Sequence, residues 1–575
     1  MGLPCIEILK TFRYGFSMDL ATATYISFVP VFVLLFSPFV RTQILYPIVL
    51  VYTMVLLILF SFLGILDVGL YADWGTRLST QILPSLQNPG GMLACVTTWQ
   101  LILLILVEIA VVLGFIFLYL FLFKPFTKQK KTKWWSIFFV LTYGALLIIP
   151  MRGGLQLTPI NLSRVYFSSH LFANHAATNP YWSFFGRLIF SSSSVREINF
   201  FDTTTYEEIV NNSLQPSKNI PIFIKTKNGE PVNVILIVLE SFSNKVIEPL
   251  GGAAGITPNF NKLATEGILF NNFYACGHRS DKGMAGLLAS YPALVGPYSI
   301  LHFVEKMDNL DYLANYFNKK DYTTHFYYAG EVDFYNMKCL VRQSNFGRIV
   351  SVYDFPSSAK QQNWGVPDEL FYERIAADLE NFSSPFFLVT YNISSHPPYD
   401  IPNIAERNYA QAVTYCDKWL GYFVNLLIKS NLWDNTLVII TSDHGTLDFV
   451  STSYSNPLSH KIPMLWTGGV IDTSFIHSKI GMQTDLSVTL VEQLGWKSNP
   501  NPFSKNLFGK NEYAFYFNYN GYGFVSPELS YHYDMDLDTI DFYYYQSKCV
   551  KDSLLNFSKA FVQYVYADFR KLGQP

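Results

Sequence analysis

The long uncharged stretches of this chain are concentrated in roughly its first 150 residues, which constrains the fold more than any other feature. A helix needs about 20 consecutive apolar residues to cross a hydrocarbon core of about 30 Å. Four stretches reach or approach that length and predict an N-terminal α-helical transmembrane domain. The predicted spans are Ala21 to Val40, Ile44 to Ile65, Leu101 to Phe123 and Trp134 to Pro150.

The loop between the third and fourth predicted spans indicates an orientation. Five lysines fall between Lys124 and Lys133, and loops rich in lysine stay on the cytoplasmic side of a membrane. We therefore expect a multi-pass membrane protein with residues 151–575 on the outer face. With four spans the chain start falls outside as well. Lys10 and Arg13 are unexpected there and indicate a further span upstream or an interfacial first segment.

The overall composition excludes several classes of protein. Half of the 575 residues are hydrophobic and 15% are charged, against about 25% charged in soluble proteins, so disorder and a collagenous fibre are excluded. The 41 Lys+Arg and 43 Asp+Glu leave a net charge of -2, and we expect no nucleic-acid partner. The six cysteines are too widely spaced for a disulfide scaffold or a zinc knuckle. A single bridge, Cys276 to Cys339 or Cys416 to Cys549, stays open.

Beyond the predicted spans the sequence is that of a soluble protein. We expect a connector over residues 151–231 and a second domain over 232–575 with a Tyr-rich C-terminal part. Short β-rich runs alternate with longer amphipathic runs, which predicts an α/β domain with a mostly parallel sheet covered by helices. The predicted strands are Val232 to Leu239, His325 to Tyr328, Phe386 to Tyr391 and Leu437 to Thr441. The predicted helices are Asn259 to Glu266, Asp281 to Ala289, Leu310 to Asn318, Glu369 to Leu379, Tyr409 to Lys429 and Thr484 to Leu494.

Three predicted strands end in the residue types that a metal-dependent hydrolase or transferase needs. Glu240 follows the first, Asp443 and His444 follow the last, and His396 follows the strand that ends at Tyr391. A carboxylate that closes a buried apolar strand is costly unless it is paired or binds a metal. Each residue alone could be a helix cap or a loop histidine. Because the carboxyl ends of parallel strands meet at one crevice, we expect the four to converge on one site.

Ser280 is the candidate nucleophile. It follows a Gly-containing turn at the predicted start of a helix, so its hydroxyl faces the positive helix end. A serine in that place is commonly a cap and nothing more. Here Arg279 and His278 would add positive charge for an oxyanion, and a metal at the strand ends would lower the pKa of the hydroxyl.

Four segments, in this order, resemble the lipoteichoic acid synthase branch of the sulfatase and alkaline phosphatase superfamily. They are Asn233 to Ser243, Thr257 to Gly267, the segment around Ser280, and Thr441 to Gly445. Arg152 to Pro159, just after the last predicted span, also resembles that branch.

The resemblance implies a phosphotransferase anchored in a bacterial cell membrane, with its catalytic domain on the extracytoplasmic side. It would move phosphoglycerol or phosphoethanolamine from a phospholipid to a glycan or glycolipid acceptor through a phosphoserine intermediate. The implied cofactor is a divalent metal, commonly Mn²⁺ in this branch, with Zn²⁺ or Mg²⁺ as alternatives. Carried over by motif, the metal ligands are Glu240, Ser280, Asp443 and His444, with Ser280 also the nucleophile. His396 would contact the substrate phosphate.

The sequence departs from the family pattern in two places. Ser280 stands where these synthases typically have threonine. Tyr335 and Met337 fall where they have an aromatic residue and an arginine, and Lys338 follows Met337 directly. Tyr335, Lys338 and Arg279 are the remaining substrate-binding candidates. The Cys/Ser-x-Pro-x-Arg pattern of formylglycine sulfatases is missing at Cys276 to Ser280, which disfavours true sulfatase activity. Two alternatives remain: a metal-dependent phosphodiesterase, phosphatase or sulfatase-type hydrolase, and a non-catalytic scaffold.

Overall fold

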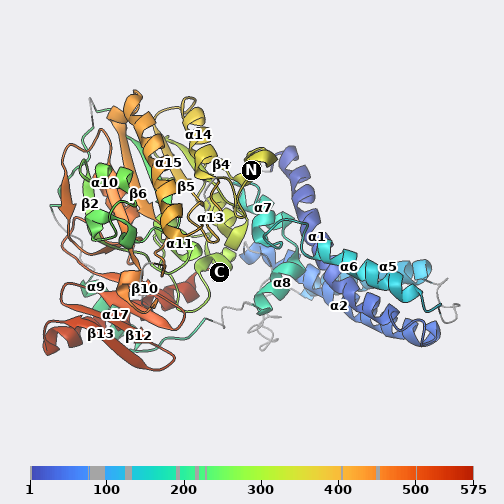
Figure 1. Cartoon of the computed structure of the whole chain (residues 1–575). Helices are drawn as coiled ribbons and strands as arrows, with labels where there is room; N and C mark the ends of the chain where they lie inside the picture. Colours follow the sequence, from blue (N-terminus) through green and yellow to red (C-terminus); the bar gives the residue numbers. More distant parts are fainter. Residues whose placement is uncertain are drawn as a thin grey trace. The chain divides into compact units, whose positions relative to one another are not determined.

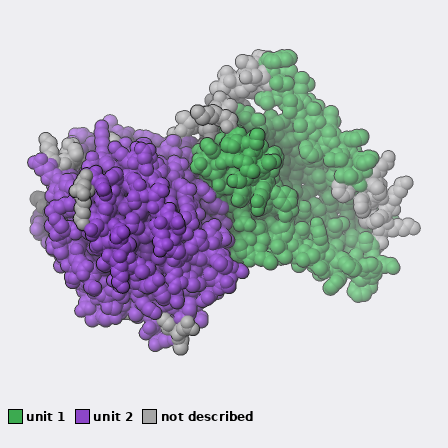
Figure 2. All heavy atoms as spheres, turned by 90° about the horizontal axis from the view of Figure 1, so that it is seen from above, with its two compact units in different colours: residues 1–194, 574–575 green, residues 195–573 purple. Residues whose placement is uncertain are grey.

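The structure is a computed structural model, and it divides into two compact units. Unit 1 comprises residues 1–194 with 574–575, and unit 2 comprises residues 195–573 (Figure 2). The structure describes residues 3–74, 77, 98–123, 132–189, 195–213, 219–226, 229–402, 406–448, 453–499 and 501–573.

Three helices of unit 1 are long and apolar enough to cross a membrane, which confirms the predicted class of this region. They are α1 (Cys5–Leu34), α2 (Thr42–Trp74) and α5 (Thr98–Phe123). The fourth predicted span corresponds to α6 (Ser136–Met151), an apolar helix of 16 residues. The lysines between Lys124 and Lys131 lie outside the described residues, so the orientation stays a prediction.

The first predicted span was misplaced. The helix runs from Cys5 to Leu34 rather than from residue 21 to 40, and a turn follows it. Its two acids are paired within the unit: Ser168 donates to Glu7 at 3.0 Å and Asn179 donates to Asp19 at 2.7 Å. The helix begins well before the predicted span, and the segment after α6 supplies the partners of these acids.

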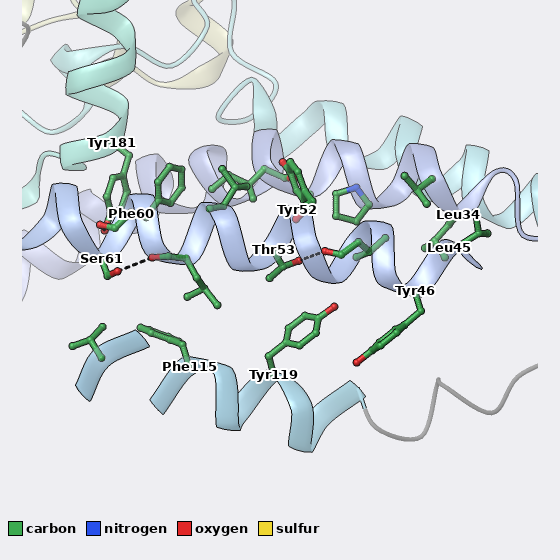
Figure 3. A pocket seen from close by; sticks show the side chains of 18 of the residues that line it. Leu34, Leu45, Tyr46, Tyr52, Thr53, Phe60, Ser61, Phe115, Tyr119 and Tyr181 are labelled. Carbon is green, nitrogen blue, oxygen red and sulfur yellow. Dashed lines mark hydrogen bonds between the residues drawn. The ribbon is translucent and has the colours of Figure 1, made fainter. Parts of the chain in front are cut away.

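An apolar groove of about 920 Å³ lies among α1, α2 and α5 (Figure 3). Its polar side chains largely donate hydrogen bonds to backbone carbonyls. Tyr52 donates to the Ile26 carbonyl at 2.8 Å, and Tyr181, on α8 (Pro180–Ile189), donates to that of Phe60 at 2.9 Å. The groove wall is thereby suited to an apolar environment. Unit 1 also contains α7 (Leu171–Ala177).

A mixed sheet forms the core of unit 2. Its order is β4-β3-β5-β1-β6-β7-β2-β8, with β9 paired to β2. Neighbours from β4 to β6 are parallel, and β7 runs antiparallel to both β6 and β2. The predicted mostly parallel sheet is confirmed. The strands are β1 (Asn233–Leu239), β2 (Ile268–Tyr274), β3 (Thr323–Tyr328), β4 (Arg348–Val350), β5 (Phe386–Tyr391), β6 (Thr436–Ser442), β7 (Lys461–Thr467), β8 (Phe475–His477) and β9 (Gly481–Met482).

The three central strands, β5, β1 and β6, are buried along their whole length. An apolar strand buried on both faces needs a helical layer on each side, and helices lie beside this sheet in Figure 1. They are α10 (Pro258–Ala264), α11 (Ser280–Ala289), α12 (Leu313–Asn318), α13 (Met337–Gln343), α14 (Asp368–Leu379), α15 (Tyr409–Lys429) and α16 (Asp485–Gln493).

The Tyr-rich C-terminal part forms a second, antiparallel sheet and a long helix. Helix α17 (Lys548–Lys571) packs against α9 (Thr203–Ser213). Cys276, Cys339 and Cys416 are free thiols, so neither disulfide left open by the sequence forms. The strands of this sheet are β10 (Ala514–Phe517), β11 (Gly521–Val525), β12 (Leu529–Asp534) and β13 (Thr539–Tyr545).

A glycine sets the distance between α11 and the end of β6. A Cβ at Gly283 would lie 1.8 Å from the carbonyl oxygen of Asp443. The helix can therefore approach the strand end only because this residue has no side chain. The start of α11 is brought in this way to the carboxyl edge of the sheet.

We predict that Gly283→Ala lowers the free energy of unfolding by about 1–3 kcal/mol, because the added methyl group forces helix and strand apart. Thermal unfolding measures the change. The control is Gly347→Ala, at an exposed glycine where the nearest atom to the new Cβ is 3.4 Å away. Equal unfolding temperatures for the two variants would contradict the close-approach argument.

Candidate functional site

The predicted metal ligands converge at the carboxyl ends of β1 and β6. These strands pair in parallel, with Leu239 opposite Ser442, so the residues that follow them come level with one another. Glu240, Asp443 and His444 each offer a ligand atom, and these atoms all lie within 4.8 Å of one another. The residues that follow these two strands thus lie together, as the sequence predicts.

The cluster places two carboxylates where water cannot screen them. Glu240 is 1% exposed and Asp443 is fully buried. Burial raises the pKa of Glu240, and the neighbouring charge of Asp443 raises it further. Ionised together, the two groups need a compensating positive charge.

His444 is oriented to meet those carboxylates. Its Nδ1 lies 2.7 Å from the carbonyl oxygen of Gly445, which can only accept, so Nδ1 carries the hydrogen. Nε2 then faces Asp443 Oδ2 at 3.4 Å and Glu240 Oε1 at 3.8 Å. Burial alone would lower the pKa of His444, but the two carboxylates raise it by more, so it is raised overall. A divalent cation held by the three groups would take the place of that proton.

Ser280 lies next to this cluster, at the first residue of α11. Its Oγ is 3.5 Å from His444 Nε2, and the residue is half-buried. The hydroxyl is thus open to a substrate, and the free N–H groups of the helix start are close by. Two carboxylates, an imidazole and a hydroxyl form a donor set that suits Mn²⁺, Zn²⁺ or Mg²⁺, so these residues fit the implied metal.

Ser241 is a site residue that the sequence did not single out. Its backbone is left-handed, with φ of 57°, which is unfavourable for a non-glycine residue and is found at functional sites. This conformation points its N–H at Asp443 Oδ1, at 2.7 Å, and its hydroxyl at Glu240 Oε1, at 2.8 Å. The strained turn therefore orients both carboxylates.

Tyr391 was missed as well, although it stands at the end of β5. Its hydroxyl donates to Asp443 Oδ2 at 2.8 Å and also contacts Glu240 Oε2. The sequence signal was present, because the residue closes a predicted strand at the same edge as the other site residues. Carboxylates and imidazoles are the common ligands of divalent metals, so a phenol at a strand end does not by itself indicate a metal site.

Arg279 and Tyr335, two of the predicted substrate-binding residues, lie together. The guanidinium sits 5.1 Å above the Tyr335 ring. It is also held by Asp281, through Nε at 3.1 Å and Nη2 at 2.8 Å. Much of its charge is therefore already balanced by a carboxylate. Lys338, the third candidate, pairs with Asp333 at 3.5 Å.

A series of aromatic contacts connects Tyr335 with His396. Tyr335 packs on Phe334 at 4.3 Å between ring centroids, Phe334 on Trp364 at 5.5 Å, and Trp364 on His396 at 4.7 Å. His396 is close enough to Glu240 to lower the pKa of that carboxyl, against the larger effect of burial. Trp364 carries no motif that would have identified it from the sequence.

His278 does not supply the positive charge expected of it. Burial lowers its pKa to about 2, so the imidazole is neutral at physiological pH. Its ring instead packs against Tyr454 at 4.7 Å and Tyr519 at 4.4 Å. The expectation was wrong because the sequence does not reveal the aromatic side chains that enclose this ring.

Comparison with known proteins indicates the family and the fold to which this part of the chain is similar. The sulfatase family model matches residues 232–476. Lipoteichoic acid synthase 2 of Bacillus subtilis (strain 168) is 23% identical over 354 residues, covering 56% of this chain and 54% of the relative. The chain spans about half the length of the curated relatives it matches.

Two solved structures share the fold. A protein in the alkaline phosphatase superfamily from Vibrio parahaemolyticus superposes with a TM-score of 0.56 and 22% identity, covering 64% of this chain and 97% of that one. The lipoteichoic acid synthase LtaP from Listeria monocytogenes gives 0.52 and 19%, covering 64% and 98%. Residues 232–476 therefore form a sulfatase-family domain with the fold of the alkaline phosphatase superfamily, and curated lipoteichoic acid synthases are among its relatives.

Proposed function

We propose that this chain is a membrane-anchored, metal-dependent phosphotransferase. It moves phosphoglycerol, or phosphoethanolamine, from a phospholipid to a hydroxyl of a glycan or glycolipid. One observation carries the proposal: the Ser280 hydroxyl stands at a helix start, 3.5 Å from His444, beside the two buried carboxylates. The lipoteichoic acid synthases among the relatives support the choice of reaction.

Each side chain has a defined task in this mechanism. Ser280 is the nucleophile, while Glu240, Asp443 and His444 hold the divalent cation together with the Ser280 oxygen. When bound, the cation supplies the charge that lowers the pKa of the hydroxyl and balances the phosphate oxygens. The start of α11 directs backbone N–H groups at the same oxygens. His396, Arg279, Tyr335 and Lys338 surround the phosphate and the head group.

The reaction proceeds in two balanced steps. In the first, Ser280 Oγ forms a bond to phosphorus, the bond to the diacylglycerol oxygen breaks, and the hydroxyl proton passes to that oxygen. Diacylglycerol leaves and a phosphodiester on Ser280 remains. In the second step the acceptor hydroxyl displaces Ser280, whose oxygen recovers a proton. Charge develops on the phosphate oxygens in both steps, which is where positive groups accelerate phosphoryl transfer.

The apolar helices give the proposal its physical setting. They would hold the catalytic domain at a bilayer surface, where the effective concentration of a lipid donor is high. We divide the chain accordingly into a membrane domain (1–150), a connector (151–231) and a catalytic domain (232–575). We place the catalytic domain outside the cell membrane.

We predict that Ser280→Ala abolishes release of diacylglycerol, with a loss of at least about 10³-fold, because the covalent step needs this oxygen. The assay uses the full chain in detergent with Mn²⁺ and fluorescent phosphatidylglycerol or phosphatidylethanolamine. Release from a single lipid by the parent protein would also identify the donor.

The control is Ser358→Ala, at an exposed serine, which should leave the rate unchanged. Undiminished release by Ser280→Ala would rule out Ser280 as the nucleophile. Cleavage of a soluble phosphodiester by the parent, with no release from either lipid, would favour the hydrolase alternative.

Stability should depend on pH through Glu240 when no metal is present. Its pKa in the folded state lies above the usual value of about 4.3, so in the unfolded chain the group ionises first. The metal-free protein therefore loses stability as the pH rises above about 4.3, until the folded pKa is passed. Glu240→Gln should remove this contribution, which thermal unfolding across pH can measure.

Mn²⁺ should reverse the order of stability of the parent protein and the Glu240→Gln variant. At a concentration of 100 times its Kd, the metal stabilises the parent by about 2.7 kcal/mol, whereas Glu240→Gln lacks a charged ligand and should gain far less. Glu266→Gln, at an exposed acid, should behave as the parent. Equal stabilisation of the parent and Glu240→Gln would contradict the assignment of Glu240 as a ligand.

A further inference from the structure

Tyr391 is held rigidly in the middle of the sheet. It is the last residue of β5, it is fully buried, and it lies opposite Val238 of β1. Its ring stacks on that of Tyr328, from β3, with 4.6 Å between centroids and 9° between the planes. Because both neighbouring strands confine the ring, its hydroxyl has essentially one position.

That position lies between the two buried carboxylates. The hydroxyl is 2.8 Å from Asp443 Oδ2 and is also hydrogen-bonded to Glu240 Oε2. The opposite oxygens are fixed by other groups: Asp443 Oδ1 accepts from the N–H of Ser241 and of His444, and Glu240 Oε1 accepts from the Ser241 hydroxyl. The phenol thus contacts the other oxygen of each carboxylate, and Asp443 Oδ2 also faces His444 Nε2 at 3.4 Å.

We propose that Tyr391 is a positioning residue of the metal centre. Its hydroxyl keeps the Glu240 and Asp443 carboxylates converged, with their oxygens aimed at a shared cation, in the presence and absence of that cation. Without it, two like charges in a buried site would turn apart. The inference rests on the proposed metal site and adds a residue that contacts the ligands rather than the substrate.

The energetic basis is the orientation of the ligands. Groups that hydrogen-bond to metal ligands fix their direction, and their loss typically weakens metal binding by about 10–100-fold. A neutral donor suits this task between two buried acids, since it places a hydrogen between them without adding a charge that would compete with the metal.

The test is Tyr391→Phe in the full chain, which keeps the ring and its stacking and removes the hydroxyl alone. We expect Mn²⁺ to bind about 10–100-fold more weakly, as followed by the electron paramagnetic resonance signal of free Mn²⁺ during titration of metal-free protein. Any bound Mn²⁺ should also show an altered spectrum, because the carboxylates around it have turned. A merely structural loss would not change that spectrum.

Tyr328→Phe is the matched control. It makes the same change in the ring that stacks on Tyr391, one strand further from the carboxylates. We expect its Mn²⁺ affinity to equal that of the parent. A folded Tyr391→Phe protein that binds Mn²⁺ as tightly as the parent, with the same spectrum, would overturn the proposal.

Two further outcomes have defined meanings. If Tyr391→Phe fails to fold by circular dichroism, Tyr391→3-fluorotyrosine preserves the shape and makes the hydroxyl a stronger donor. An altered Mn²⁺ affinity and spectrum would then support the proposal, and unchanged values would overturn it. If the parent itself does not bind Mn²⁺, the proposed metal-dependent function fails. If the parent binds Mn²⁺ and Tyr391→Phe binds it with the same affinity, only the proposed role of Tyr391 fails.

Discussion

The enforced proximity of two buried carboxylates, Glu240 and Asp443, is the constraint on which the site depends. In a low-dielectric interior their repulsion is poorly screened, and it raises the pKa of Glu240 beyond the effect of burial. The groups around them act against that repulsion. Ser241 donates to both from a strained turn, Tyr391 donates from the neighbouring strand, and His444 presents a nitrogen. This arrangement of two carboxylates and an imidazole suits the binding of a cation.

The sheet positions this cluster where a ligand can reach it. Parallel pairing brings the ends of β1, β5 and β6 to one edge, and ligand sites of open α/β sheets form there. Gly283 lets α11 approach that edge closely enough for Ser280 to reach His444. The fold is shared by enzymes of the alkaline phosphatase superfamily, so the reaction has to be argued from these side chains and not from the architecture.

Sequence patterns succeeded where local periodicity and burial agree. The predicted limits of β5 and α15 match the structure, because β5 is a short apolar run bounded by polar turn residues and α15 is a long amphipathic helix with a clear period. They failed for the start of α1, where polar residues interrupt the apolar pattern and their partners lie far along the chain. They also failed for the Tyr-rich sheet from β10 to β13, where aromatic residues occupy both faces and no alternation appears.

The sequence by itself identified the polar groups that the structure brings together at one edge of the sheet. Glu240, Asp443 and His444 follow apolar strands, and Ser280 opens a helix, so local pattern and the strand-end rule were enough to bring them together. Only the tertiary structure decided what surrounds them: the phenol of Tyr391 between two acids, the pairing of Arg279 with Asp281, and the neutrality of His278. The reason is physical. Which side chains meet across neighbouring strands depends on register and packing between segments far apart in the chain, and no local period encodes that.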